Sequence, residues 1–321
     1  MSSSVLVSYT HEDSHLNTPV SSPSAAEFAV VIVSFNTVEL LRACLKSVLK
    51  QSPAEVIVVD NASSDGSAEM VRTEYPAVVL QVNQTNVGYG RAANQAIANS
   101  AAKYVLLLNA DTVLETGALM QLQTYLDVHS EAAVVGPRLL NPDRSLQSSC
   151  RSFPRPLSLY PLIKRVPMWR THYLLTWEHN RDRAVGWLTG AALAIRREAF
   201  NSAGGFDESY FMYFEEVDLC CRLRQKGWQI HFTPTAEITH VGGASTRQCH
   251  PEMEVALYTS TKLFYRKHSS GILLLLSIVT FKCKRLGRLI RDSVRLYITK
   301  DPESRFRILQ SIAACRRVLG M

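Results

Sequence analysis

The first half of the chain alternates continuous apolar runs with segments whose apolar residues recur at helical spacing. Mostly apolar runs, typical of strands buried on both faces, occupy residues 28–35, 55–60, 78–82, 104–108 and 132–135, and the first of them is rich in β-branched residues. Helical spacing marks residues 38–50, a segment that ends at 75, and residues 90–101 and 117–128. Strands that alternate with helices predict an α/β fold with a mostly parallel sheet and helices on both faces.

The pattern loosens in the second half. Proline recurs between Asn141 and Asp182, which predicts an irregular connection. Regular structure is expected again over 185–196, then a helical turn to 203, a helix over 216–226 and a short strand over 228–232. The stretch from Met253 to Met321 is predicted to be helical. With 321 residues, 46% of them hydrophobic, the chain can build one sizeable domain with an appendage.

The C-terminal helical stretch is strongly basic. From Lys262 to the end it holds 14 Lys and Arg against 3 Asp and Glu, a net charge of +11, whereas the rest of the chain carries −4. An apolar patch over 273–279 precedes a basic series: Lys282, Lys284, Arg285, Arg288, Arg291 and Arg295. This pattern favours an amphipathic helix on an anionic membrane surface. The alternative is a helix packed on the core with a solvated basic face.

No segment is expected to cross a membrane, because the longest apolar run, 271–281, has 11 residues and a spanning helix needs about 20. Residues 1–26 are rich in Ser, Thr and Pro and lack the features of a signal peptide, so we expect a disordered lead-in. The seven cysteines form no Cys-x-x-Cys pair, which favours reduced, packing cysteines. These features favour a cytoplasmic protein, held peripherally at the inner face of the cell membrane.

Acidic residues stand where the predicted strands end. Asp60 closes the second apolar run and Asp111 follows the fourth. Ligands of parallel sheets bind beyond the carboxyl ends of the strands, where carboxylates can hold a hard cation against phosphate oxygens. A second acidic group, Phe214 to Asp218, lies among aromatic residues, where a carboxylate can gain a raised pKa and act as a general base. Together they indicate metal-assisted group transfer from a phosphorylated donor.

Seven motifs follow one another between about Phe28 and Thr246. They are VSFN (33–36), VVDNASSDGS (58–67), NVGYGRAANQA (86–96), LLNADT (107–112), WLTGAALAIRREAF (187–200), GGFDESYFMYFEEVDLCCRLRQKGW (204–228) and HVGGAS (240–245). In this order they resemble the family 2 inverting glycosyltransferases, in particular the bacterial rhamnosyltransferase-like members. The resemblance implies a GT-A (Rossmann-like) fold, a nucleoside-diphosphate sugar donor, Mg²⁺ or Mn²⁺, and inversion at the anomeric carbon.

The resemblance also implies domain boundaries and a reaction. It implies a GT-A domain over 27–250, with a nucleotide-binding half over about 27–136 and an acceptor half over about 183–250, followed by a helical basic tail over 251–321. The expected reaction moves a sugar, with rhamnose the first candidate, to a glycan or lipid-linked acceptor in cell-envelope polysaccharide synthesis.

The donor side is expected at the strand ends. The Asp60 carboxylate can accept the imide N–H of uracil or thymine, or it can cap its own loop. The turn Gly88-x-Gly90 lets backbone approach a ligand. Asn109 replaces the first carboxylate of the family's Asp-x-Asp, so Asp111 should carry most of the metal contact, and His240 matches a further metal ligand, unless it is structural. The full donor set is Ser34, Asn36, Asp60, Gly88, Gly90, Arg91, Asn94, Asn109 and Asp111.

The general base is expected at the acidic pair Glu215-Glu216. Glu216 occupies the position of the family's catalytic Asp and is one methylene longer. A displacement of roughly one ångström matters for the geometry of attack, so Asp218, otherwise a first-turn acid that favours the helix dipole, remains the second candidate. The acceptor side is expected to comprise Trp187, Gly190, Asp207 and Glu215.

Three other functions were weighed. A sugar-nucleotide pyrophosphorylase needs a basic, glycine-rich loop after the first strand, and residues 34–39 contain neither Gly nor Lys. A catalytically weakened homologue that only binds nucleotide-sugar is compatible with the departures at Asn109 and Glu216. Nucleic-acid binding by the basic tail is not expected, because no recognisable module accompanies it.

Overall fold

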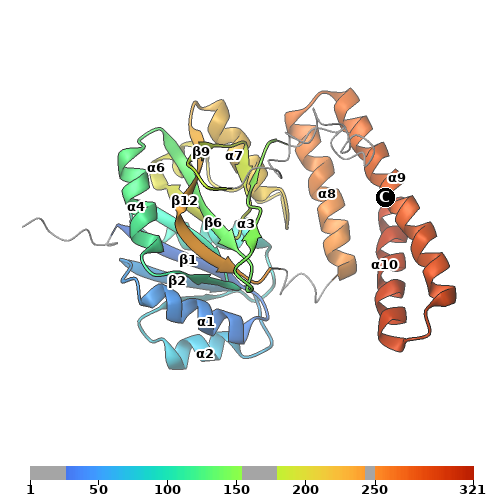
Figure 1. Ribbon diagram of the computed structural model, residues 1–321, viewed down its shortest axis with the longest axis horizontal. Helices are drawn as coiled ribbons and strands as arrows, with labels where there is room; N and C mark the ends of the chain where they lie inside the picture. Colours follow the sequence, from blue (N-terminus) through green and yellow to red (C-terminus); the bar gives the residue numbers. More distant parts are fainter. Residues whose placement is uncertain (1–26, 154–178, 243–249) are drawn as a thin grey trace, which may run out of the picture.

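The computed structural model describes residues 27–153, 179–242 and 250–321. They form an α/β body built around one sheet and a bundle of long helices at the C-terminal end (Figure 1). The expected disordered lead-in, most of the expected irregular connection and the end of the motif at 240–245 lie outside the described residues.

The α/β body follows the predicted alternation of strands and helices. Its elements in chain order are β1 (Phe28–Ser34), α1 (Val38–Leu49), β2 (Glu55–Asp60), α2 (Ser67–Glu74), β3 (Val79–Val82), α3 (Tyr89–Ala98), β4 (Tyr104–Asn109), β5 (Thr112–Leu114), α4 (Ala118–Val128), β6 (Ala132–Leu140), β7 (Leu146–Gln147), β8 (Cys150–Arg151), β9 (Arg183–Ala184), β10 (Trp187–Leu188), β11 (Ala192–Arg196), α6 (Arg197–Ser202), α7 (Glu215–Gln225) and β12 (Gln229–His240).

The strands of the main sheet lie in the order β3-β2-β1-β4-β11-β6-β12-β5. Strand β1 pairs in parallel with β2 and β4, and β6 pairs in parallel with β12. The predicted, mostly parallel sheet is confirmed, although β11 is antiparallel to both of its neighbours and β5 is antiparallel at the edge. Because the parallel strands all point the same way, the carboxyl ends of β2, β4 and β12 meet at one edge.

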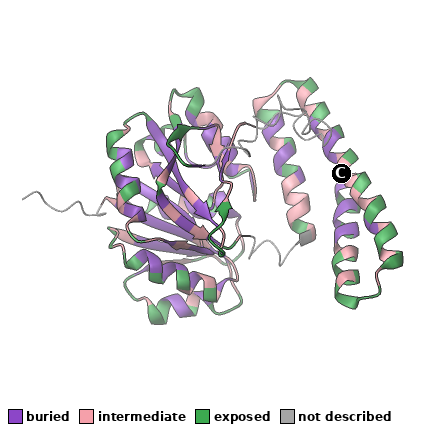
Figure 2. Cartoon of the chain, in the orientation of Figure 1, coloured by how far each residue is buried: buried purple, intermediate pink, exposed green. Residues whose placement is uncertain are grey.

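Helices bury both faces of the sheet, and the strands are accordingly buried almost throughout (Figure 2). In β1, Val30 and Ile32 join the cluster that includes residues of α1, α2 and α4, whereas Val31 joins the cluster of α3, α6 and α7. Alternate side chains of one strand therefore enter two different cores. This double burial explains why the strands are continuous apolar runs and not alternating patterns.

The second half departs from prediction in three places. Strand β12 runs on to His240, past the expected end at 232, and its pairing with β6 shifts register between Phe232 and Glu237. That irregularity accommodates Pro234, which has no N–H to give to a ladder. The expected regular stretch 185–196 is broken into β10 and β11, and β5 was not expected. The extension of β12 matters most, because it delivers His240 to the edge where Asp111 lies.

The C-terminal helices are α8 (His250–His268), α9 (Gly271–Ile298) and α10 (Pro302–Gly320), and they pack against one another. Helix α8 also packs on the loop before α7. The Ser260 hydroxyl donates to the carbonyl of Met212 at 2.8 Å, and Phe264 and Tyr265 form a cluster with side chains of that loop and of α7. The helical tail is thus anchored to the part of the body that carries the acidic pair.

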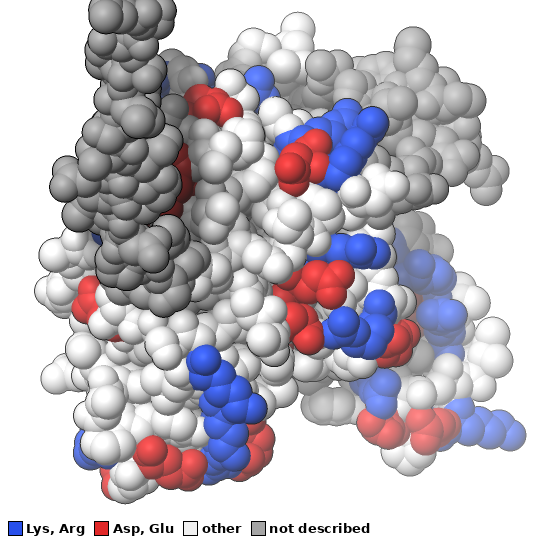
Figure 3. Space-filling view, turned by 60° about the vertical axis from the view of Figure 1, so that its left-hand side comes forward, with Lys and Arg blue, Asp and Glu red and all other residues white. Residues whose placement is uncertain are grey.

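The basic series on α9 was interpreted wrongly in part. Arg285 and Arg288 turn inward and form ion pairs with Glu254 of α8. The other face of α9 exposes apolar side chains at helical spacing, among them Ile272, Leu275, Val279, Leu286, Ile290 and Val294. No helix among the described residues is long and apolar enough to cross a bilayer. On the face seen in Figure 3, basic side chains mostly adjoin acidic ones.

Candidate active site

The carboxyl ends of the parallel strands gather predicted polar residues at one edge of the sheet. Asp60 ends β2, Asn109 ends β4 and His240 ends β12. The backbone N–H of Val241 donates to the carbonyl of Asp111 at 3.0 Å, which joins the end of β12 to the turn after β4. Asp60, Asp111 and His240 are 1%, 8% and 8% exposed. Such burial of polar side chains is costly unless partners or a ligand satisfy them.

Asp60 keeps one carboxylate oxygen without a partner. Its Oδ2 accepts the backbone N–H of Ser63 at 2.9 Å, while Oδ1 is buried with no hydrogen-bond partner among the described residues. The neighbouring strand end shapes the loop above it, because Asn36 Oδ1 accepts the N–H of Ser64 at 2.8 Å and the Ser34 hydroxyl lies 3.0 Å from that of Thr37. The free oxygen of Asp60 is a ready acceptor for a ligand N–H.

Asparagine side chains hold the segment that leads into α3. Asn61 donates to Asn86 Oδ1 at 2.9 Å, and its own Oδ1 accepts the N–H of Val87 at 3.1 Å. Asn83 donates to the same oxygen at 3.1 Å. The sequence interpretation assigned no role to these amides; their placement directly after two strands was the available signal. They fix residues 83–88 against the end of β2.

Gly88 and Gly90 pack closely against other parts of the protein. A Cβ at Gly88, whose φ is +87°, would lie 2.4 Å from the carbonyl oxygen of Phe211, and one at Gly90 would lie 3.1 Å from Cβ of Phe206. The absence of a side chain at both positions is therefore required by the loop before α7, a contact that the sequence did not indicate; their approach to a ligand stays a prediction. The N–H of Tyr89 donates to that same carbonyl of Phe211 at 3.1 Å. The glycines bring α3 and the acidic pair together.

Asp111 and His240 form a pair whose donor atoms fit a divalent cation. Nε2 of His240 lies 3.2 Å from Oδ1 of Asp111. Nδ1 of His240 lies 2.6 Å from Oε1 of Gln147, and because an amide oxygen only accepts, Nδ1 carries a proton; in the neutral imidazole Nε2 then turns its lone pair toward the carboxylate. Two electron-rich atoms at this distance are stabilised by a cation, and outer-sphere amides commonly orient a metal-binding imidazole in this way.

Glu215 and Glu216 open α7 after a strained turn. Tyr213 and Phe214 have φ angles of 67° and 69°, a region that bulky residues rarely occupy and that clusters at functional sites. Burial, and then the charge of Glu216, raises the pKa of Glu215 well above its usual range. Burial raises the pKa of Glu216 to about 7, against backbone hydrogen bonds and the positive charge of Arg151. Burial therefore favours the neutral form of Glu215, and Glu216, with a pKa of about 7, is partly ionised at neutral pH.

Tyr89 connects the two acidic groups. Its hydroxyl donates to the carbonyl of Gly190 at 3.1 Å. Burial, followed by the charges of Glu215, Glu216 and Asp111, raises the pKa of this phenol well above its usual range. The candidate base and the candidate metal ligand therefore surround one buried side chain. A Cβ at Gly190 would lie 3.8 Å from Cγ of Glu216, so Gly190 lies directly alongside the base candidate.

Asp218 is occupied by structural contacts. It is 1% exposed; Arg222 Nε lies 2.6 Å from Oδ2, and His268 Nε2 of α8 lies 2.7 Å from Oδ1. The Tyr210 hydroxyl donates to Oδ1 at 3.3 Å. Burial raises the pKa of Asp218, but the hydrogen bonds and charges of His268 and Arg222 outweigh it and hold the pKa below its usual value. A carboxylate of low pKa with these partners is a poor proton acceptor.

The contact between Asp218 and His268 makes stability depend on pH. Hydrogen bonds with Asp218, to whose carboxylate Nε2 donates, and then with Cys221 raise the pKa of His268 to about 9 from its usual 6.5. The stabilisation is complete below about pH 6.5 and is lost as the pH rises through 9, because the neutral imidazole gains less from the carboxylate. We expect the free energy of urea unfolding to fall by about 2–3 kcal/mol between pH 6 and 9.5. His268→Gln should remove most of this fall; an equal fall in the variant would contradict the assignment.

The other predicted residues are placed at the periphery. Arg91 Nε lies 3.5 Å from Glu208 and its side chain is half exposed. Asn94 brackets the backbone of Phe206, donating to its carbonyl and accepting its N–H at 2.9 Å each. Asp207 forms an ion pair with Lys267 of α8. Burial alone would raise the pKa of Asp207, but the hydrogen bonds that Lys267 and Ser209 donate outweigh burial and lower this pKa to about 2.

Trp187 and Arg151 border the acidic pair from the small sheet of β8 and β10. The Trp187 indole donates to the carbonyl of Ser152 at 2.9 Å, and the Arg151 guanidinium lies 5.7 Å from the centre of the Trp187 ring. Arg151 is the cation that acts on Glu216. It was not predicted, because it lies in a proline-rich stretch whose pattern carried no signal of its place.

Comparisons with solved structures identify the fold. The mannosyltransferase PcManGT from Pyrobaculum calidifontis, in complex with GDP-Man and Mn²⁺, matches with a TM-score of 0.52 at 16% identity, over 93% of this chain and 89% of that one. GalNAc-T7 with UDP, GalNAc and Mn²⁺ matches with a TM-score of 0.51 at 18% identity, over 66% of this chain and 43% of that one. The fold is that of the GT-A glycosyltransferases.

Sequence relatives identify the family. A family model described as glycosyltransferase like family 2 matches residues 24–259. The N-acetylglucosaminyl-diphospho-decaprenol L-rhamnosyltransferase of Mycobacterium tuberculosis (strain H37Rv) is 34% identical over 242 residues, 70% of this chain and 78% of that protein. The rhamnosyltransferase WbbL of Escherichia coli (strain K12) is 29% identical over 161 residues, 48% of this chain and 60% of that protein. The chain belongs to glycosyltransferase family 2 and is a glycosyltransferase.

Proposed function

We propose that this enzyme transfers rhamnose from a nucleoside-diphosphate donor to a lipid-linked acceptor, with inversion at the anomeric carbon and with the help of Mg²⁺ or Mn²⁺. The observation that carries the proposal is the arrangement around Tyr89. Asp111, which pairs with His240, and Glu216, with a pKa of about 7, both lie close enough for their charges to act on this phenol. A cation site and a base at one buried phenol are what a single-displacement transfer from a diphosphate requires.

The donor is proposed to lie along the strand ends. The free Oδ1 of Asp60 is proposed to accept the imide N–H of a uracil or thymine ring, as a UDP or dTDP donor would present it. Asp111 and His240 hold the cation, and Asn109 at the end of β4 lies beside them. A divalent cation in this place neutralises the charge of the departing diphosphate. Relatives include one described as a dTDP-rhamnosyl transferase, from Shigella flexneri, at 22% identity.

Glu216 is proposed as the general base. It takes the proton of the acceptor hydroxyl, for which its pKa near 7 is well matched. Protonated Glu215, buried beside it, keeps a second negative charge away from the site. The binding-only alternative rests on two departures from the family pattern, Asn109 in place of the first carboxylate and Glu216 in place of Asp. The strained turn and the burial that tune Glu216 favour catalysis, since a protein that only binds donor needs no base of raised pKa.

The acceptor is proposed to be an N-acetylglucosaminyl-diphospho-polyprenol, the substrate class in the name of the mycobacterial relative. A transfer assay tests the function: the purified enzyme with Mn²⁺ is given this acceptor and, in parallel, dTDP-rhamnose, UDP-sugars and GDP-sugars. We expect transfer from dTDP-rhamnose, with the product's anomeric centre inverted on NMR. Retention of configuration, or thermal stabilisation by a donor with no transfer to any acceptor, would contradict the proposal.

The exposed face of α9 is proposed to lie on anionic lipid and to bring the site to this acceptor. Ile272, Leu275 and Ile290 are 71%, 60% and 59% exposed and follow one stripe of the helix, where burial in the interface is favourable. Arg291 and Arg295 are exposed beside the stripe, as suits contact with acidic headgroups.

A double substitution tests the membrane contact. Leu275→Glu with Ile290→Glu is expected to weaken binding to vesicles of phosphatidylglycerol and phosphatidylcholine by about tenfold or more, because apolar burial is lost and like charges repel. Both side chains are exposed, so folding should be retained. Val79→Glu, an exposed apolar position on β3, is the matched control. Equal vesicle binding by all three proteins would exclude α9 as the contact.

A further inference from the structure

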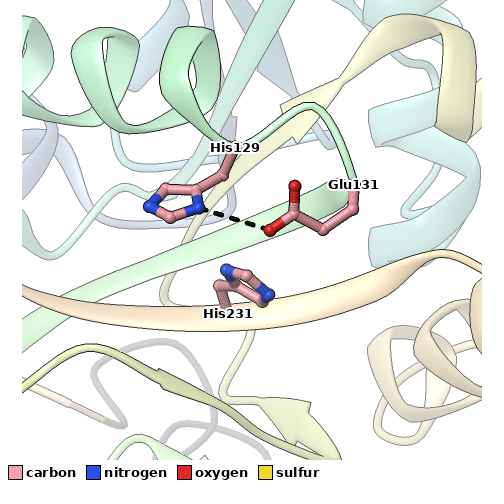
Figure 4. Close-up of side chains that lie close together, drawn as sticks. All are labelled: His129, Glu131 and His231. Atoms are coloured by element: carbon pink, nitrogen blue, oxygen red, sulfur yellow. Dashed lines mark hydrogen bonds and ion pairs between the residues drawn. The ribbon is translucent and has the colours of Figure 1, made fainter.

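We propose that His129, Glu131 and His231 form a second metal site, selective for Zn²⁺, at the end of the sheet away from Asp111 and His240. One ligand atom from each of the three lies within 4.8 Å of the others. Figure 4 shows the side chains converging from three segments: the end of α4, the residue before β6 and the start of β12.

The Asp111–His240 pair and the three-residue cluster lie at opposite ends of β12. His231 is its third residue and His240 its last. Nine residues of strand correspond to roughly 30 Å, so no ligand can touch both sites. The three-residue site is thus independent of donor binding and of the transfer chemistry.

Gln229 and Tyr125 fix the imidazole of His231. Its Nε2 lies 2.9 Å from Oε1 of Gln229, and because that oxygen accepts, Nε2 carries the proton. Nδ1 is then an acceptor and takes a hydrogen bond from the Tyr125 hydroxyl at 3.1 Å, whose place a metal ion would take on binding. Nδ1 of His129 lies 3.3 Å from Oε1 of Glu131. The hydrogen bond from Nε2 of His231 to Gln229 is of the kind that orients metal-binding imidazoles in other proteins.

The backbone of the site is fixed before any ion enters. The N–H of His129 donates to the carbonyl of Tyr125 at 3.0 Å, and its own carbonyl accepts from Ala132 N and from Arg196 Nη2, both at 3.1 Å. The N–H of Gln229 donates to the carbonyl of Glu131 at 3.0 Å. The rings of Tyr125 and His129 pack with centroids 4.3 Å apart. Little conformational freedom remains for binding to remove.

The donor set favours zinc. Two imidazole nitrogens and one carboxylate, with a fourth position open, is a common zinc arrangement, whereas Mg²⁺ prefers oxygen ligands alone. Asp182 lies next to β9, whose Ala184 pairs with His231, and its charge acts on both Tyr125 and His231. Its carboxylate adds negative charge beside the open position. His129 is partly exposed and Glu131 is exposed, so an ion enters without unfolding.

The experiment uses the full chain with Asp111→Asn, which removes the carboxylate of the catalytic pair. Zn²⁺ is titrated by calorimetry and by thermal unfolding. We expect one Zn²⁺ per chain and an increase in Tm of about 5 °C at a hundredfold excess over Kd. Adding His129→Gln or Glu131→Gln should weaken Zn²⁺ binding at least tenfold and abolish the Tm increase. Both side chains lie at the surface, so neither variant threatens folding.

Glu198→Gln, an exposed carboxylate of α6, is the matched control and should bind Zn²⁺ like its parent. If His129→Gln and Glu131→Gln bind Zn²⁺ with the parent's affinity and gain the same Tm, the ion is held elsewhere and the site is refuted. An absence of Zn²⁺ binding in the Asp111→Asn parent refutes it equally.

Discussion

Glu216→Gln is expected to lower kcat by about 10²–10⁴ while the affinity for the nucleotide-sugar donor stays within twofold or so. The substitution keeps the size and hydrogen-bonding capacity of the side chain and removes only its ability to accept a proton, which typically contributes this factor. Single-turnover transfer and equilibrium donor binding, measured with the same preparation, separate the two quantities. Glu216→Asp, which restores the family's usual residue, should retain activity.

Two neighbouring acids serve as controls. Burial raises the pKa of Glu215 and favours its neutral form, which glutamine mimics, so Glu215→Gln should keep kcat within about tenfold. Asp218→Asn leaves Arg222 and His268 without their buried partner and should cost about 3–5 kcal/mol of stability, yet the folded fraction should still turn over. An inactive Asp218→Asn beside an active Glu216→Gln would transfer the role of base to Asp218.

Asp111→Asn is expected to weaken donor binding in Mn²⁺ by more than about 100-fold. Loss of an outer-sphere partner usually costs 10–100-fold in metal affinity, and Asp111 is proposed to contact the ion itself. Donor binding in EDTA should be equally weak in the wild type and the variant. Calorimetric titration with dTDP, with and without Mn²⁺, measures both.

Variants of Gln147 and Asp60 provide two comparisons for this prediction. Gln147→Ala removes the acceptor that orients His240 and should give the intermediate loss of about 10–100-fold, in Mn²⁺ only. Asp60→Asn should weaken dTDP binding alike with and without Mn²⁺, because its proposed contact is with the base. A Mn²⁺-dependent affinity that survives Asp111→Asn would show that the cation lies elsewhere.

The α/β core was predictable because each buried strand is marked by the apolar pattern of its own residues. The runs at 28–35 and 55–60 are apolar throughout their central positions, a pattern that double burial requires, and they became β1 and β2 almost residue for residue. The direction of β11 was not predictable, since an antiparallel strand buried on both faces has the same apolar pattern as a parallel one. Strand β12 was cut short at 232 because Pro234 normally ends a strand, whereas here a register shift absorbs it.

The candidate site was predictable where a residue ends a strand and unpredictable where its role depends on a distant partner. Asp60 was placed by local pattern, at the end of an apolar run, whereas His240 was indicated by the family resemblance, because its strand was expected to end at 232. No local sequence pattern indicated that Gln147 would orient His240. None indicated either that His268 would form a hydrogen bond with the carboxylate of Asp218, which lies 50 residues earlier in the chain. The backbone freedom of Gly88 was predicted, but its partner was not, because the loop at Phe211 reaches it only through the tertiary fold.

The central proposal, that Glu216 is the general base, is tested most directly by the pH dependence of kcat for transfer. A base must be ionised to act, so kcat should rise with pH and level off above an apparent pKa of about 7, the value that burial gives Glu216. In Glu216→Gln the small remaining rate should lack this limb. A kcat that is flat between pH 5.5 and 8.5 in the wild type, or a limb near pH 7 that persists in Glu216→Gln, would contradict the assignment.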